Sequence, residues 1–196
     1  MKQFRLVCLI VLFVAAVSSV SAQVPPPPPP APDYDPKLWK EYSFAADNVR
    51  FRFPVEPKRV ESTTGTSKRP SVTFSRQSFI YFDVTVTTFP ESLDKPGDKK
   101  GLLDAGVNGM LSRIQNAEPK VLAQQDVSVD GYPARFLKVE TKDGLLIRVK
   151  FFAVENKLYI ALAVSEKGKR HGFNWENDFE IPAMAFLDSV HLVKTK

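Results

Sequence analysis

The sequence predicts an α+β domain with a central antiparallel sheet of about six to eight strands flanked by helices. Strand patterns cluster in two groups and do not alternate with helices, which argues against a parallel βαβ sheet. Only two segments show a helical period. Turns of two or three residues separate the four strands of the second group, and such short turns force neighbouring strands to run antiparallel.

Residues 1–22 are typical of a secretory signal. A short basic start with Lys2 and Arg5 leads into an apolar stretch, Leu6 to Val17, and small residues end at Ala22. The apolar stretch is shorter than the roughly 20 residues of a spanning helix and suits a signal peptide. We therefore expect cleavage before Gln23 and export to the periplasm or the extracellular space.

A proline-rich linker is predicted at 23–38, ahead of one folded domain at 39–196. Residues 23–36 hold eight prolines in fourteen positions. Proline locks φ and lacks an N–H donor, so this segment can join neither a helix nor a sheet. We expect an extended polyproline II spacer of about 3.1 Å per residue.

Composition excludes several classes of function. The only cysteine, Cys8, lies in the signal, so the mature chain has no disulfide and no thiol nucleophile. Loss of Lys2 and Arg5 with the signal lowers the net charge from +5 to +3, which is weak for a nucleic-acid binder. No later apolar run is long enough to span a membrane. We expect neither nucleic-acid binding nor a transmembrane span in the mature chain.

The first group of strands is predicted at 39–44, 48–53, 71–76 and 79–89, with a polar loop at 63–70. Residues 48–53 alternate cleanly, because Val49, Phe51 and Phe53 share one face and Arg50 and Arg52 share the other. Residues 79–89 give the strongest strand signal, with aromatic and β-branched side chains throughout.

A helix is predicted from about Lys99 to Gln115, with Asp98 as its N-cap and one apolar stripe that needs a sheet to cover it. Four strands follow, at 120–129, 134–141, 145–154 and 158–164. Asp130-Gly131 and Asp143-Gly144 are strong hairpin signals between them. A final helix is expected from about Ile181 to Ser189, with Pro182 in its first turn.

Several local patterns together resemble exported bacterial domains of the PsbP/Mog1-like type. They are Trp39, residues 49–54, residues 129–134, residues 156–159 and residues 186–190. The resemblance covers roughly residues 39–194 and implies an α/β/α sandwich around an antiparallel sheet. That family includes photosystem-associated lumenal subunits, a nuclear transport cofactor and many bacterial proteins of unknown role, so the resemblance implies no catalytic residues.

The residues offer no recognisable catalytic, metal or cofactor site. The mature chain has two histidines, His171 and His191, whereas a zinc site needs three or four converging ligands. No Gly-x-Ser-x-Gly elbow is present. Carboxylates such as Asp83, Glu140 and Glu155 are interpreted as parts of solvated faces. We expect a protein that is not an enzyme and that holds no cofactor.

Two groups of residues are candidates for contact with a partner. Arg50 and Arg52 share the polar face of one predicted strand, and Arg148 and Lys150 share that of another. If these strands are neighbours, the four cations form one basic surface; the alternative is a solvated face balanced by acids.

The second group lies in the polar loop 167–175. It mixes cationic and aromatic side chains, the types enriched in interface hot spots: Arg170, His171, Phe173 and Trp175. The alternative is that Phe173 and Trp175 attach the loop to the core.

The leading hypothesis is an exported accessory or protein-interaction module of the cell envelope, whose partner is an envelope protein or complex. The first alternative is a periplasmic domain that binds a small ligand between sheet and helix. The second is an enzyme of unrecognised type. The sequence leaves the oligomeric state open.

Overall fold

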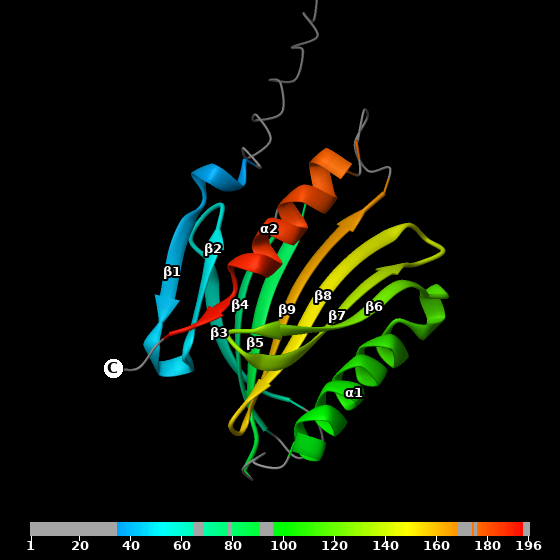
Figure 1. The fold of residues 1–196 in the computed structure, drawn as a ribbon. Helices are drawn as coiled ribbons and strands as arrows, with labels where there is room; N and C mark the ends of the chain where they lie inside the picture. Colours follow the sequence, from blue (N-terminus) through cyan, green and yellow to red (C-terminus); the bar gives the residue numbers. More distant parts are fainter. Residues whose placement is uncertain are drawn as a thin grey trace, which may run out of the picture. The chain divides into compact units, whose positions relative to one another are not determined.

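The computed structural model describes residues 35–64, 69–77, 80–90, 96–167, 174 and 176–193. These residues belong to one compact unit, Ala31–Lys196. Within them lie a seven-stranded antiparallel sheet, a three-stranded antiparallel sheet and two α-helices (Figure 1). The predicted α+β fold with a central antiparallel sheet is confirmed. None of the helices in the described ranges is both long and apolar enough to cross a bilayer.

The larger sheet has the order β3-β4-β5-β9-β8-β7-β6. Its strands are β3 (Lys58–Thr64), β4 (Arg69–Gln77), β5 (Tyr81–Thr88), β6 (Lys120–Val129), β7 (Tyr132–Glu140), β8 (Leu145–Val154) and β9 (Lys157–Glu166). The predicted four-strand meander is confirmed as β6 to β9. Between β5 and β6 the helix α1 (Pro96–Arg113) carries the chain to the far edge of the sheet, and the meander brings β9 back beside β5.

Each face of this sheet has its own core, because alternate residues of a strand point to opposite faces. On β8, Val149 and Phe151 pack in the core that α1 covers. Phe152 and Val154 belong to the core on the other face. The helix α2 (Ile181–Ser189) contributes Phe186 to that second core. One helix therefore packs on each face of the sheet.

The smaller sheet joins α2 on the second face. It consists of β1 (Lys40–Phe44), β2 (Val49–Phe53) and β10 (His191–Leu192) in the order β1-β2-β10. Phe53 of β2 meets the ring of Phe186 edge-on at 5.2 Å between centroids, and Trp39 meets Phe82 at 5.4 Å. The Arg52 backbone N–H donates to Ser189 Oγ at 3.0 Å, which ties β2 to the end of α2.

Three details differ from the expectations. The strand β3 was not predicted, because its residues are mostly polar and exposed at a sheet edge, which leaves no alternating pattern to read. The helix α1 begins at Pro96, two residues before the expected cap, since proline suits the first turn. The two-residue strand β10, which contains His191 and pairs with β2, was also not predicted.

The close approach of α1 to β8 depends on Gly106. A Cβ at this position would lie 3.1 Å from Cδ1 of Phe151, whereas a Cβ at Gly101 or Gly109 would meet nothing within 4 Å. We expect Gly101→Ala and Gly109→Ala to raise the free energy of unfolding by about 0.5–1 kcal/mol each, through helix propensity. Gly106→Ala is expected to lower it by about 1 kcal/mol, because overpacking outweighs that gain. Urea denaturation measures all three; equal stabilisation by the three alanines would contradict the packing of α1.

Candidate functional site

The predicted cations do not form one basic surface. Arg50 and Arg52 lie on β2 in the smaller sheet, and Arg148 and Lys150 lie on β8 in the larger one. The strand adjacency that the prediction required is absent, so that part of it is wrong. A role of any single one of these residues in partner contact stays a prediction.

Arg148 and Lys150 are also not on a solvated face. Arg148 is 3% exposed and Lys150 is 8% exposed, because α2 and the turn before it cover this side of β8. Arg148 donates to Glu180, with Nε 2.8 Å from Oε2. Lys150 Nζ donates at 3.0 Å to both the Leu187 carbonyl and Asp188 Oδ1 near the end of α2, where a cation is favoured by the helix dipole.

The two arginines of β2 have local partners. Arg50 Nη1 lies 3.2 Å from Glu41 Oε2 in an exposed pair. Arg52 Nη2 donates to the carbonyl of Trp39 at 3.2 Å. These contacts connect β2 to Glu41 of β1 and to Trp39, the residue that precedes β1. The loop candidates Arg170, His171, Phe173 and Trp175 lie outside the described residues.

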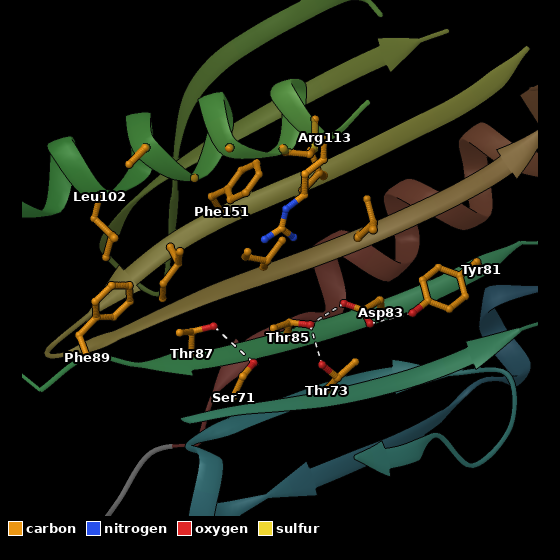
Figure 2. Close-up of a pocket in the computed structure, with 18 residues that line it drawn as sticks. Ser71, Thr73, Tyr81, Asp83, Thr85, Thr87, Phe89, Leu102, Arg113 and Phe151 are labelled. Atoms are coloured by element: carbon orange, nitrogen blue, oxygen red, sulfur yellow. Dashed lines mark hydrogen bonds between the residues drawn. The ribbon is translucent and has the colours of Figure 1, made fainter. Parts of the chain in front are cut away.

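A groove of about 570 Å³ opens between α1 and the larger sheet (Figure 2). The helix α1 packs mainly on β7 and β8 and touches Leu158 of β9, and among the described residues no helix packs closely on the same face of β5 and β4. Leu102 and Phe89 lie at one end of the groove, and Arg113 and Tyr81 lie toward the other (Figure 2). The groove is thus elongated, with the helix as one wall and β4 and β5 as the other.

The wall made by β4 and β5 is lined by hydroxyl groups and one carboxyl group. Alternation along β5 aims four side chains at the groove, and two from β4 join them: Tyr81, Asp83, Thr85, Thr87, Ser71 and Thr73. Thr73 Oγ1 and Thr85 Oγ1 are 3.0 Å apart, and Ser71 Oγ and Thr87 Oγ1 are 3.4 Å apart. These cross-strand pairs form a continuous polar strip (Figure 2).

Asp83 lies between Tyr81 and Thr85 in this strip and is only 6% exposed. Its Oδ2 accepts a hydrogen bond from Tyr81 Oη at 3.0 Å, and its Oδ1 accepts one from Thr85 Oγ1 at 2.9 Å. Burial raises the pKa of Asp83 to about 6, against the opposing effect of these two hydrogen bonds. Burial and the nearby Asp83 raise the pKa of Tyr81 to about 12. Among the described residues, no cation pairs with the Asp83 carboxylate.

The floor and the helical wall are mostly apolar. The floor contains the side chains of β8 and β9 that alternate toward α1: Val149, Phe151, Leu158, Ile160 and Leu162. On the helix, Ala105, Gly106 and Gly109 have small side chains or none, so the helical wall projects little into the groove. Met110 contributes a flexible thioether side chain to the same wall. Arg113 reaches from the last turn of α1 into the groove (Figure 2) and makes no ion pair with any described residue.

The prediction that Asp83 lies on a solvated face is wrong, because its side chain is buried. Alternation identified the polar face of β5 correctly. It did not show that β4 and β9 flank this strand on both sides, which removes the Asp83 side chain from solvent. The available signal was the composition of every second residue from 81 to 87: three of these residues carry a hydroxyl group and the fourth is Asp83. Within the described residues, no three His, Cys, Asp or Glu side chains are grouped as a metal site would require.

Comparisons with known proteins bear on the fold. No family model matches the sequence, and no curated protein matches it. The solution structure of cyanobacterial PsbP (CyanoP) from Synechocystis sp. PCC 6803 is similar, with a TM-score of 0.56 and 14% identity over 79% of this chain and 92% of that chain. The Ran-binding protein Mog1p of Saccharomyces cerevisiae matches with a TM-score of 0.45 and 13% identity, over 80% of this chain and 96% of that one. The likeness to CyanoP shows a shared PsbP-like fold.

Proposed function

We propose that this chain is an exported, non-enzymatic interaction module of the cell envelope, which holds a segment of a partner protein in the groove between α1 and the larger sheet. The observation that carries the proposal is the groove itself: α1 covers β7 and β8, while the polar strip of β4 and β5 lines the groove beside an apolar floor. An elongated groove with one polar wall and an apolar floor suits an extended chain segment that carries both polar and apolar side chains.

The buried carboxyl group supports a binding role for this face. A buried charge without a paired cation costs stability, and such costs persist where they serve a site. Asp83 is the one carboxylate among the described residues that line the groove. Export is supported by the basic start, short apolar stretch and small residues of positions 1–22.

Binding of a small ligand is the second candidate function. The volume of about 570 Å³ lies within the range of roughly 300–1,000 Å³ that is common for ligand pockets. An apolar floor with a few polar groups on one wall is also the usual composition of such a pocket. The same groove would then hold a small amphipathic molecule in place of a chain segment.

The variant Gly109→Leu tests the proposal. A side chain at position 109 enters open space in the groove, and no atom lies within 4 Å of the added Cβ, so the groove is filled without a clash there. Gly101→Leu is the matched control, because its Cβ also meets nothing and Gly101 does not line the groove. We expect the mature protein and Gly101→Leu to capture the same envelope partner from extract, and Gly109→Leu to lose at least about nine-tenths of it.

The competing prediction is that the partner contacts the loop 167–175 instead of the groove. Arg170→Ala and Trp175→Ala remove two of the predicted hot-spot side chains. If these variants lose the partner while Gly109→Leu retains it, the contact lies on the 167–175 loop and the groove proposal is overturned. If no variant changes the captured set, the interaction does not use either surface, and ligand screening by thermal shift follows.

A further inference from the structure

We propose that the groove receives a positively charged group on an apolar stem, a lysine or arginine side chain of the partner, with its charged head against Asp83 and its stem along the floor. This inference rests on the proposed function and adds the chemistry of the contact. Three features of the groove carry it: a carboxylate that pairs with no cation among the described residues, the apolar floor beside it, and the position of Arg113.

The Asp83 carboxylate has unused capacity to accept hydrogen bonds. An ionised carboxylate offers about four lone-pair sites, and Asp83 has one hydroxyl donor on each oxygen. Tyr81 and Thr85 hold the group in place but supply no charge. Hydrogen bonds from an ammonium or guanidinium group are about twice as strong as those between neutral groups. A cationic donor is therefore the partner that this carboxylate lacks within the described part of the chain.

The neighbouring floor selects a cation with an apolar stem over a bare ion. Leu158, Ile160 and Leu162 on β9 run beside β5 and line the groove. Lysine and arginine bury their methylene stems on such surfaces while their charged heads reach a polar partner. A metal ion would gain nothing from this floor, and Asp83 is the one carboxylate available to it among the described lining residues.

Arg113 shows that the groove accommodates a side chain of this kind. Its stem comes off the last turn of α1 and its guanidinium lies within the groove (Figure 2). It is exposed and has no ion-pair partner among the described residues, so no ion pair to a described residue has to break when a partner enters. Its charge repels an incoming cation, and its removal should strengthen cation binding.

Proton competition gives the interaction a pH dependence. Besides Asp83, the charged or titratable groups that line the groove are Arg113 and Tyr81, and burial raises the pKa of Tyr81 to about 12, far above neutral pH. The pKa of Asp83, raised by burial to about 6, lies close to neutral pH. Affinity for a cation is therefore expected to fall as the pH drops through about 6, when Asp83 gains its proton.

The test is a titration of the labelled mature protein with hexylammonium at pH 7.5, followed by amide chemical shifts. Hexanol and hexanoate are the matched neutral and anionic probes. We expect hexylammonium to shift the amides of Asp83 and Thr85, with an affinity about tenfold lower in Asp83→Asn, which corresponds to about 1.4 kcal/mol. Arg113→Gln should bind it several-fold more tightly. Asp104→Asn, an acid of α1 outside the groove lining, should bind as the parent does.

Two results would overturn the inference. One is an unchanged affinity for hexylammonium in Asp83→Asn. The other is preferential binding of hexanoate that is lost in Arg113→Gln, which would assign the groove to an anionic group. Neither result contradicts the proposed function by itself, because Gly109→Leu can still lose the partner when the cation prediction fails. If Gly109→Leu captures the partner as the mature protein does, the proposed function itself is contradicted.

Discussion

Glu180→Gln is expected to destabilise the protein by about 3 kcal/mol, the loss typical of a buried ion pair deprived of one partner. The Glu180 side chain joins two cations, Arg148 on β8 and Lys138 on β7. These cations are direct cross-strand neighbours, an arrangement that is unfavourable without a shared anion. Burial raises the pKa of Glu180, but the hydrogen bonds and charges of Arg148 and Lys138 outweigh it and leave the pKa below its usual value.

The effect should be visible in both thermal and urea unfolding at pH 7.5. A loss of about 3 kcal/mol corresponds to a fall of roughly 6–12 °C in Tm for a domain of this size. Glu118→Gln is the matched control, because its pair with Lys142 is largely exposed on both sides and should contribute at most about 1 kcal/mol. If Glu180→Gln behaved like Glu118→Gln, Arg148 would be solvated, and its burial beneath α2 would be contradicted.

Asp83→Asn is expected to stabilise the protein at pH 7.5 by about 2–3 kcal/mol. Asp83 has a pKa of about 6, whereas its ordinary value is 3.8, so ionising it in the folded protein costs roughly 3 kcal/mol at about 1.4 kcal/mol per pH unit. Asparagine fills nearly the same volume without charge. Its amide group can still bond to the hydroxyl groups of Tyr81 and Thr85.

The sign of the effect depends on pH. Because burial raises the pKa of Asp83, the folded state holds its proton more tightly than the unfolded state does. Protonated Asp83 makes a favourable contribution to the free energy of unfolding. This contribution is present below about pH 4 and is lost as the pH rises through about 6. Urea unfolding of both proteins should show the advantage of Asp83→Asn at pH 7.5 and little difference at pH 4. An advantage of equal size at both values would mean that the charge of Asp83 is not the cause.

Most of the helices and strands could be predicted, because the residue pattern that indicates each of them lies within a single segment of the chain. Asp130 and Gly131 have φ values of 49° and 86°, so the hairpin that this dipeptide predicts is present between β6 and β7. The order of the sheet was not accessible in the same way. Nothing in the residues 39–53 shows that β1 and β2 form a separate sheet, because their alternation is the same in either arrangement.

The site was less predictable for a related reason. Alternation assigns a residue to a face but does not say what covers that face. It grouped Arg148 with Lys150, and it placed Asp83 among hydroxyl groups, yet α2 buries the first face and the flanking strands bury Asp83. The groove exists because α1 crosses β7 and β8 and stops short of β5, and this placement follows from packing across the whole sheet.

The most direct test of the groove as the contact site is a map of the bound surface. The envelope partner captured by the mature protein is added to the labelled protein, and changes in amide shifts are recorded residue by residue. We predict that the largest changes lie on the groove side of α1 and on β4 and β5, around Asp83 and Thr85. Changes confined to residues 167–175, or to the exposed edge strand β6, would contradict it.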